Sequence, residues 1–186
     1  IIYPIVMGWQ WGGGWLAELG FSDFAGSTLV HSTGGAAALA GAMIIGPRLG
    51  RFTKSGAPAP LKPFAASSIP LVTIGVFILW LGWFGFNGGS QLAMGTAVDA
   101  IAVSTIFMNT FLAGAGGVIG AAIITRLHFG KTDVVQMLNG CIGGLVAVTA
   151  EPLAPSPFAA ILIGAVGGLI VVYGTKLLFS LKIDDV

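Results

Sequence analysis

Charged side chains are scarce in this sequence. The 186 residues include 8 Lys and Arg and 7 Asp and Glu, so charged residues make up 8% of the chain while hydrophobic residues make up 55%. An ordinary soluble domain carries about 25% charged residues. A water-facing surface cannot be built from so few charges, and disorder needs the opposite combination of low hydrophobicity and high charge. The composition therefore predicts an integral membrane protein.

The net charge is close to zero, there is one cysteine, and known catalytic motifs are absent. A formal net charge of +1 provides no basic surface for nucleic acid, and a single cysteine, Cys141, excludes an internal disulfide framework and a cysteine-based zinc site. The chain contains no glycine-rich phosphate loop, no His-Glu-x-x-His helix and no nucleophile elbow. We therefore expect neither an enzyme nor a resident cofactor or metal.

Long apolar stretches indicate how many helices cross the membrane. A spanning helix needs about 20 mostly apolar residues. The stretches of suitable length that carry at most one charge are 24–46, 64–86, 100–125, 134–150 and 156–178, with 1–9 as the tail of a further helix. The sequence Asn-Gly-Gly-Ser at 87–90 is expected to end the second span. The predicted fold class is an all-α, polytopic helix bundle.

The basic residues are confined to one set of loops between these spans. If the spans alternate in direction, every Lys and Arg falls in 47–63, in 126–133 or after about residue 175. The other loops, 10–23, 87–99 and 151–155, contain acidic residues and no Lys or Arg. By the positive-inside rule, loops 47–63 and 126–133 are expected to be cytoplasmic in a multi-pass protein of the cell membrane.

Small residues recur one helical turn apart in four of the expected spans. The chain has 30 glycines, and the repeated steps are Gly34/Ala38/Ala42, Gly116/Gly120, Gly140/Gly144 and Gly164/Gly168. Such steps place small residues on one face of a helix and let neighbouring helices approach closely in a membrane. Tight packing is the favoured interpretation, and a glycine-lined pore wall is the alternative.

Two polar residues of the span 24–46 and its entrance stand out. His31 lies eight residues past Asp23, or about 12 Å along a helix, close to the middle of a hydrocarbon core of about 30 Å. A neutral imidazole at that depth could conduct a small polar solute or a proton, or could simply bond a neighbouring helix. Asp23 is expected to cap the helix and organise the site, with direct contact to a cation as the alternative.

Aromatic residues gather toward the expected external side. Trp80, Trp83 and Phe86 follow one side of the second span, and three further tryptophans lie between residues 9 and 15. They could form an interfacial aromatic belt, or a cage that attracts a cation over ring faces. Ser90 and Asn87 follow closely and could add hydrogen-bond acceptors.

Three segments carry a distinctive combination of residues. They are Trp-Gly-Gly-Gly at 11–14, Asp-Phe-Ala-Gly-Ser-Thr-Leu-Val-His at 23–31, and Gly-Trp-Phe-Gly-Phe-Asn-Gly-Gly-Ser at 82–90. In order and spacing, over nearly the whole chain, they resemble the ammonium transporter family, which comprises ammonium transporters, methylammonium permeases and Rhesus proteins. The segment at Trp11 favours the ammonium transporter branch.

The resemblance implies a role for each of six residues. By this likeness Trp11 and Ser90 bind ammonium externally together with Phe86, which also closes the pore below that site, while His31 and Trp83 line the pore and Asp23 organises the external site. The family fold has eleven spanning helices in two inverted halves, usually assembled as a homotrimer. This chain would be an internal part of it, lacking the second pore histidine and the second gate phenylalanine; His128 is expected to be a solvated loop residue instead.

The function that the resemblance implies is ammonium transport across a membrane. Ammonium would be recruited at the external aromatic site and passed on as deprotonated ammonia along the histidines, because a bare ion in hydrocarbon is prohibitively costly. The alternatives are an ammonium sensor on the same fold and a purely structural bundle. The expected partners are ammonium or ammonia, the lipid bilayer, further copies of the chain and a PII-type regulatory protein at the cytoplasmic loops.

Overall fold

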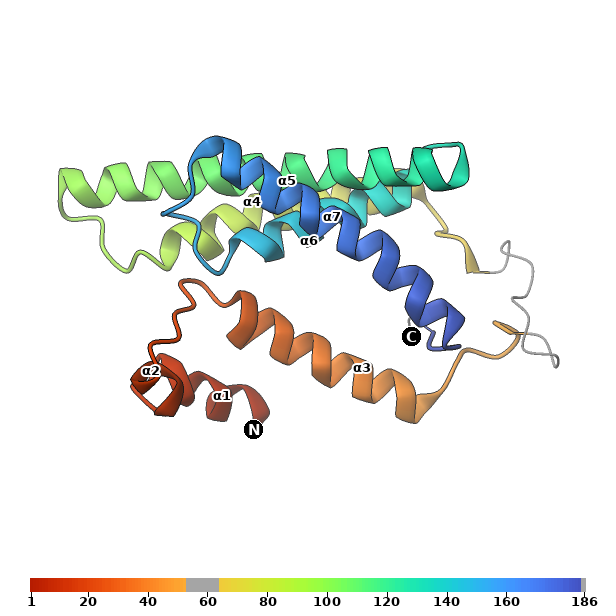
Figure 1. Cartoon of the computed structure of the whole chain (residues 1–186), viewed down its shortest axis with the longest axis horizontal. Coiled ribbons are helices and arrows are strands. Elements are labelled where there is room, and N and C mark those ends of the chain that lie inside the picture. The colour runs from red at the N-terminus through yellow and green to blue at the C-terminus, as the bar shows by residue number, and fades with distance from the viewer. Residues whose placement is uncertain (53–63, 185–186) are drawn as a thin grey trace.

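The computed structural model describes residues 1–52 and 64–184, and its regular elements are helices. The helices are α1 (Ile2–Gln10), α2 (Trp15–Glu18), the π-helix η1 (Ser27–Ser32), α3 (Thr33–Ile45), α4 (Ile69–Gly89), α5 (Ala97–Phe129), α6 (Val134–Val148) and α7 (Pro157–Ser180). Residues 53–63 of the basic loop 47–63 lie outside the described residues. Figure 1 shows α4 to α7 as one group, with α1, α2 and α3 alongside it.

Four of these helices are long and apolar enough to cross a membrane. They are the continuous η1–α3 helix Ser27–Ile45, α4, α5 and α7, while α6 is a shorter apolar helix. Large hydrophobic side chains remain exposed along them, such as Leu81 on α4, Ile101 on α5 and Ile170 on α7. Apolar helices with apolar outer faces suit a lipid surrounding.

The helix ends follow local capping chemistry. Helix α5 begins with a capping box, in which Thr96 and Asp99 exchange hydrogen bonds, and ends at Gly130 in the left-handed conformation. Ser68 caps α4, so this helix begins later than the stretch 64–86 suggests. It ends at Gly89, within the expected segment 87–90, and its last turn packs against α5 through Asn87 and Gly88.

Glycines bring α5, α6 and α7 into backbone contact. A Cβ added at Gly117 would collide with the carbonyl of Gly140, and one added at Gly164 would collide with that of Ala113. The packing interpretation of the small-residue steps therefore holds for these three helices. On α3 the outcome differs, because a Cβ at Gly34 would meet nothing within 4 Å in the described part of the chain.

Candidate functional site

Asp23 gathers the free amide groups at the start of the η1–α3 helix. Its Oδ1 accepts from the backbone N–H of Gly26 at 2.9 Å and of Ser27 at 3.0 Å, and its Oδ2 accepts from those of Thr28 and Leu29, each at 2.8 Å. The residue is 2% exposed. The N-cap position itself belongs to Gly26, whose φ of 110° is left-handed. Asp23 thus caps from three residues upstream, and it satisfies the donors that a helix start leaves unpaired.

The π-helical turn that follows sets the position of His31. The backbone N–H of His31 donates to the carbonyl of Gly26, five residues earlier, at 3.0 Å. Single π-turns of this kind are rare and occur frequently at functional sites. Because Asp23 fixes the first amides of the turn and Gly26 supplies its bend, the short segment 23–31 contains both the histidine and the groups that orient it.

The rings of His31, Trp83 and Phe86 form one aromatic stack. The His31 and Trp83 centroids lie 4.9 Å apart with the planes inclined by 20°, and His31 lies 5.3 Å from Phe86. Trp83 and Phe86 are 5.9 Å apart. Nε2 of His31 is buried and has no hydrogen-bond partner among the described residues. The stack therefore combines aromatic faces, which attract cations, with an imidazole nitrogen that is available to a polar solute.

Trp11 and Ser90 are attached to this region by separate hydrogen bonds. The indole Nε1 of Trp11 donates to the backbone carbonyl of Asp23 at 2.7 Å, and the Ser90 hydroxyl donates to the carbonyl of Phe86 at 2.9 Å. Trp11 is 40% exposed, so part of its ring is open. The tryptophans of segment 9–15 do not form one cluster, because Trp9 pairs with Trp15 at 5.7 Å while Trp11 turns to Asp23.

Three polar or aromatic residues singled out from the sequence lie elsewhere. Asn87 does not add an acceptor near Ser90: it is fully buried, and its Nδ2 donates to Thr110 on α5 at 3.0 Å. The Trp80 ring stacks on Phe111 of α5 at 5.3 Å. His128 is exposed, as expected, but it lies in the last turn of α5 and not in a loop, with its Nε2 2.6 Å from the Tyr173 hydroxyl. The positions of all three side chains depend on contacts between helices, which the spacing of residues along the sequence does not reveal.

Thr149 belongs to the site although no sequence motif pointed to it. Its hydroxyl accepts from the indole Nε1 of Trp83 at 2.9 Å and is fully buried. Residue 149 lies at the C-cap of α6, far in sequence from all three segments that carry the family resemblance. Its place next to the loop 151–155, which contains Glu151, was the one available signal.

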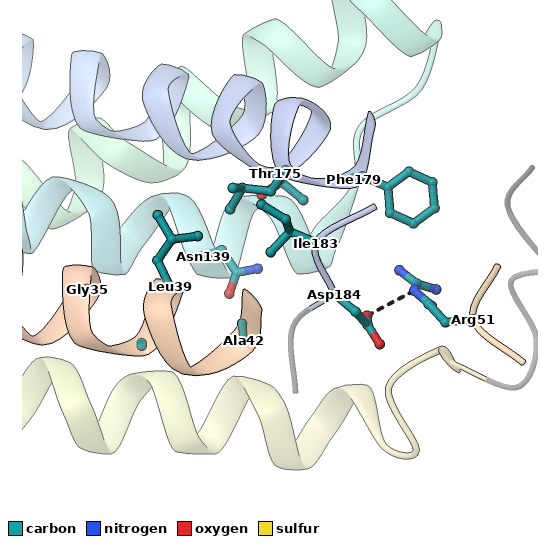
Figure 2. Close-up of a pocket in the computed structure, with 11 residues that line it drawn as sticks. Gly35, Leu39, Ala42, Arg51, Asn139, Thr175, Phe179, Ile183 and Asp184 are labelled. Carbon is teal, nitrogen blue, oxygen red and sulfur yellow. Dashed lines mark ion pairs between the residues drawn. The ribbon is translucent and has the colours of Figure 1, made fainter. Parts of the chain in front are cut away.

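A second polar feature lies at the other end of α3. A cavity of about 360 Å³ runs beside Gly35, Leu39 and Ala42, and Asn139 of α6 borders it. Figure 2 shows Asp184 and Arg51 at one end of this space, joined by an ion pair of 3.1 Å. Since Gly35 follows His31 by one helical turn, the cavity continues along the same helix toward the side where the basic residues gather.

Two arginines converge on the carboxylate of Asp184 at this end of the cavity. Arg48 donates to its carboxylate from Nε at 2.7 Å and from Nη2 at 2.8 Å, and the guanidinium of Arg51 completes the cluster. These bonds from Arg48, with the charges of both arginines, outweigh burial and hold the pKa of Asp184 well below its usual range. The cluster ties the end of α3 to the segment after α7. Among the described residues no group of three His, Cys, Asp or Glu side chains could hold a metal ion.

The apolar helices, the sorted charges and the buried polar site together define a polytopic membrane protein. The family model described as Ammonium Transporter Family matches residues 1–186, and the chain belongs to that family. Amt2, an ammonium transporter of Archaeoglobus fulgidus, is 42% identical over the whole chain, and a Synechocystis protein named provisionally for ammonium transport is 46% identical. A solved structure named Sensor Amt Protein superimposes with a TM-score of 0.88 at 37% identity.

This chain is shorter than the relatives it matches. It covers 40% of Archaeoglobus Amt2, 41% of the Synechocystis protein and 46% of the sensor chain, while each comparison includes all of this chain. The fold described here is therefore part of the larger fold found in those proteins.

Proposed function

We propose that this chain is part of a membrane protein that transports ammonium, and that its aromatic stack lines the conduction path. The observation that carries the proposal is the contact of His31 with Trp83 and Phe86, together with the unpartnered Nε2 of His31. A titratable ring that lies near the middle of the membrane and has an unpartnered nitrogen fits a path for a small polar solute. Membership of the ammonium transporter family supports ammonium as that solute.

The mechanism follows from the energies involved. A cation over an aromatic ring gains roughly 0.5–2 kcal/mol, far less than the cost of stripping a small ion of its water. Trp11, Ser90 and Phe86 can therefore recruit ammonium but cannot carry it onward. We propose that the ion transfers its proton to a water molecule on the Trp11 side of the stack, so that hydronium stays behind and neutral ammonia passes His31 and Trp83. Asp23 holds the segment in place without contacting the ion.

The family likeness also supports an arrangement in the membrane. We propose that η1–α3, α4, α5, α6 and α7 each cross the bilayer, with the basic loops 47–63 and 126–133 on the cytoplasmic side of the cell membrane. The protein would assemble as a homotrimer with one path per subunit. A PII-type regulatory protein would dock on the cytoplasmic loops.

Substitution of Trp11 tests the recruitment step. In the full-length polypeptide that contains this chain, reconstituted in liposomes, Trp11→Leu should raise the KM for ammonium several-fold, because the exposed ring face is lost. Trp15→Leu, which alters a ring paired with Trp9, is the matched control and should leave the KM unchanged. Equal loss of ammonium transport and of neutral gas passage in Trp11→Leu would contradict a cation site.

An ammonium sensor is the second candidate function, because one matching structure is named as a sensor. A sensor would bind ammonium at the same aromatic site without net flux. Ammonium-induced quenching of tryptophan fluorescence, measured beside uptake in the same liposomes, separates the two: binding with no uptake favours the sensor.

A further inference from the structure

The hydroxyl of Thr149 occupies a fixed position beside Trp83. It donates its single hydrogen to the carbonyl of Leu145 at 2.7 Å, which leaves its lone pairs to accept from the indole Nε1 at 2.9 Å. Thr in a helix has two common χ1 rotamers, and the hydrogen bond to Leu145 holds the one that is present here. The oxygen therefore presents its acceptor side to α4 in a single direction.

The Trp83 side chain is also enclosed by apolar packing. Trp83 is 8% exposed and packs in a cluster with Val76, Cys141 and Leu145. An indole has only one hydrogen-bond donor, and rotation of the ring would leave that donor buried and unpaired. The bond to Thr149 thus selects the ring orientation that stacks on His31 at 4.9 Å.

The same turn of α6 also holds the segment that carries His31. The backbone N–H groups of Phe24 and Ala25 donate to the carbonyls of Ala150 and Thr149, at 2.7 and 3.1 Å. The Ser27 hydroxyl donates to the carbonyl of Val146 at 2.8 Å. Both rings of the His31–Trp83 pair are therefore positioned from residues 146–150.

We propose that Thr149 is a positioning residue, which sets the orientation of the Trp83 ring against His31 and thereby the rate of conduction. The inference rests on the proposed function of the stack, and it deepens that function by naming a residue that need not touch the solute. Thr149→Val removes the acceptor and keeps the branched shape, whereas Thr149→Ser keeps the acceptor. Thr105→Val is the matched control, because Thr105 makes the same bond to its own helix at a half-buried site on α5, away from the stack.

The first measurement follows the hydrogen bond and does not require transport. In the purified full-length polypeptide, ultraviolet resonance Raman difference spectra against Trp83→Phe isolate the indole band that reports N–H hydrogen bonding. The bonded signature should be lost in Thr149→Val and kept in Thr149→Ser and Thr105→Val. An unchanged band in Thr149→Val would overturn the proposal. If Thr149→Val does not fold, Thr149→Cys takes its place, because a thiol is a weak acceptor.

The second measurement is ammonium uptake into liposomes. Misplacing a group in a narrow site can reduce a rate by orders of magnitude, so we expect Thr149→Val to lower the maximal rate about 10-fold. The KM should stay within about twofold, because recruitment at Trp11 is untouched, and Thr149→Ser should restore most of the rate. A lost Raman signature with an unchanged rate would overturn the proposal. Failure of the unsubstituted protein to move ammonium would instead overturn the proposed function, while the Raman result still reports on the bond.

Discussion

His31 and Trp83 lie face to face, with ring centroids 4.9 Å apart and planes inclined by 20°. One residue comes from the π-turn η1 and the other from the C-terminal half of α4. Such spacing is typical of offset stacking between rings. Because a face of the imidazole is covered by the indole, the ring is held in place by packing, and its Nε2 is left without a partner among the described residues.

This arrangement predicts that His31 can be replaced without loss of the fold. His31→Ala removes the ring but breaks no side-chain hydrogen bond seen in the described residues, so the protein should still insert in the membrane and remain folded. Ammonium conduction should fall by about 10-fold or lose its selectivity over other ions, since the only titratable ring in the stack is gone. Uptake and size-exclusion profiles of the same preparation check this. Loss of insertion with normal transport per folded molecule would contradict it.

Asp23 should be essential for the local fold. Asp23→Ala leaves four amide groups of the helix start without their acceptor, at a site that is 2% exposed. Since a hydrogen bond to a charged group contributes about 1.5–3 kcal/mol and some amides will find water, we expect a loss of roughly 3 kcal/mol in stability. Asp23→Asn keeps one acceptor oxygen, so its stability should lie between that of the unsubstituted protein and that of Asp23→Ala.

Thermal unfolding in detergent measures these Asp23 variants. Glu18→Ala is the control, because Glu18 is an exposed acidic residue five positions before Asp23, and it should change the midpoint of thermal unfolding little. A Glu18→Ala shift as large as that of Asp23→Ala would mean that general charge loss, not the helix-start bonds, is responsible.

The sequence predicted the helices well where charge marks their limits. Each expected stretch contains a helix, because apolar runs of this length have few other stable forms in lipid. At α4 the expected end within 87–90 is confirmed, since the helix ends at Gly89, but the start was placed too early because it depends on the Ser68 cap. The π-turn was also missed, since six residues are too few to separate a five-residue hydrogen-bond period from a four-residue one.

The candidate site likewise contains residues that the sequence predicted and one that it did not. The motif resemblance singled out His31, Trp83 and Phe86, which the fold brings into contact. It did not single out Thr149, because that contact joins residues 66 positions apart and leaves no pattern in either segment. Local chemistry is readable from a sequence, whereas a bond between distant helices needs their packing to be known.

Glycine contacts between α5 and α7 should tolerate no side chain. A Cβ at Gly164 would overlap the carbonyl of Ala113, and backbone atoms cannot move aside as a flexible side chain can. Gly164→Ala should therefore lower stability by about 1–3 kcal/mol through overpacking. Gly174→Ala on the same helix meets nothing within 4 Å and should be neutral or slightly stabilising. Equal unfolding midpoints for the two variants would show that α5 and α7 are not in backbone contact.

The Asp184 cluster should make stability depend on acid pH. Arg48 bonds the Asp184 carboxylate through Nε and Nη2, and Arg51 lies 3.1 Å away, so the pKa of Asp184 is lower in the folded protein than in the unfolded chain. A depressed pKa contributes stability above the unfolded value, near 3.9 for aspartate, and this contribution is lost as the pH falls toward the folded value. Asp184→Asn should thus lower the unfolding midpoint at pH 7, and its deficit should shrink below about pH 4.

Unfolding midpoints of the parent and Asp184→Asn between pH 7 and pH 3 measure that deficit. The comparison is repeated in an Arg48→Gln background, where the carboxylate has lost its principal partner, and there the Asp184→Asn deficit at pH 7 should be smaller. If the deficit is the same at every pH, the stabilisation comes from packing of the side chain and not from its charge. If it is the same in both backgrounds, the Arg48 guanidinium is not what lowers the pKa, and the stabilisation must come from Arg51 or from the backbone N–H of Arg48, which donates to Oδ2 of Asp184 at 3.0 Å.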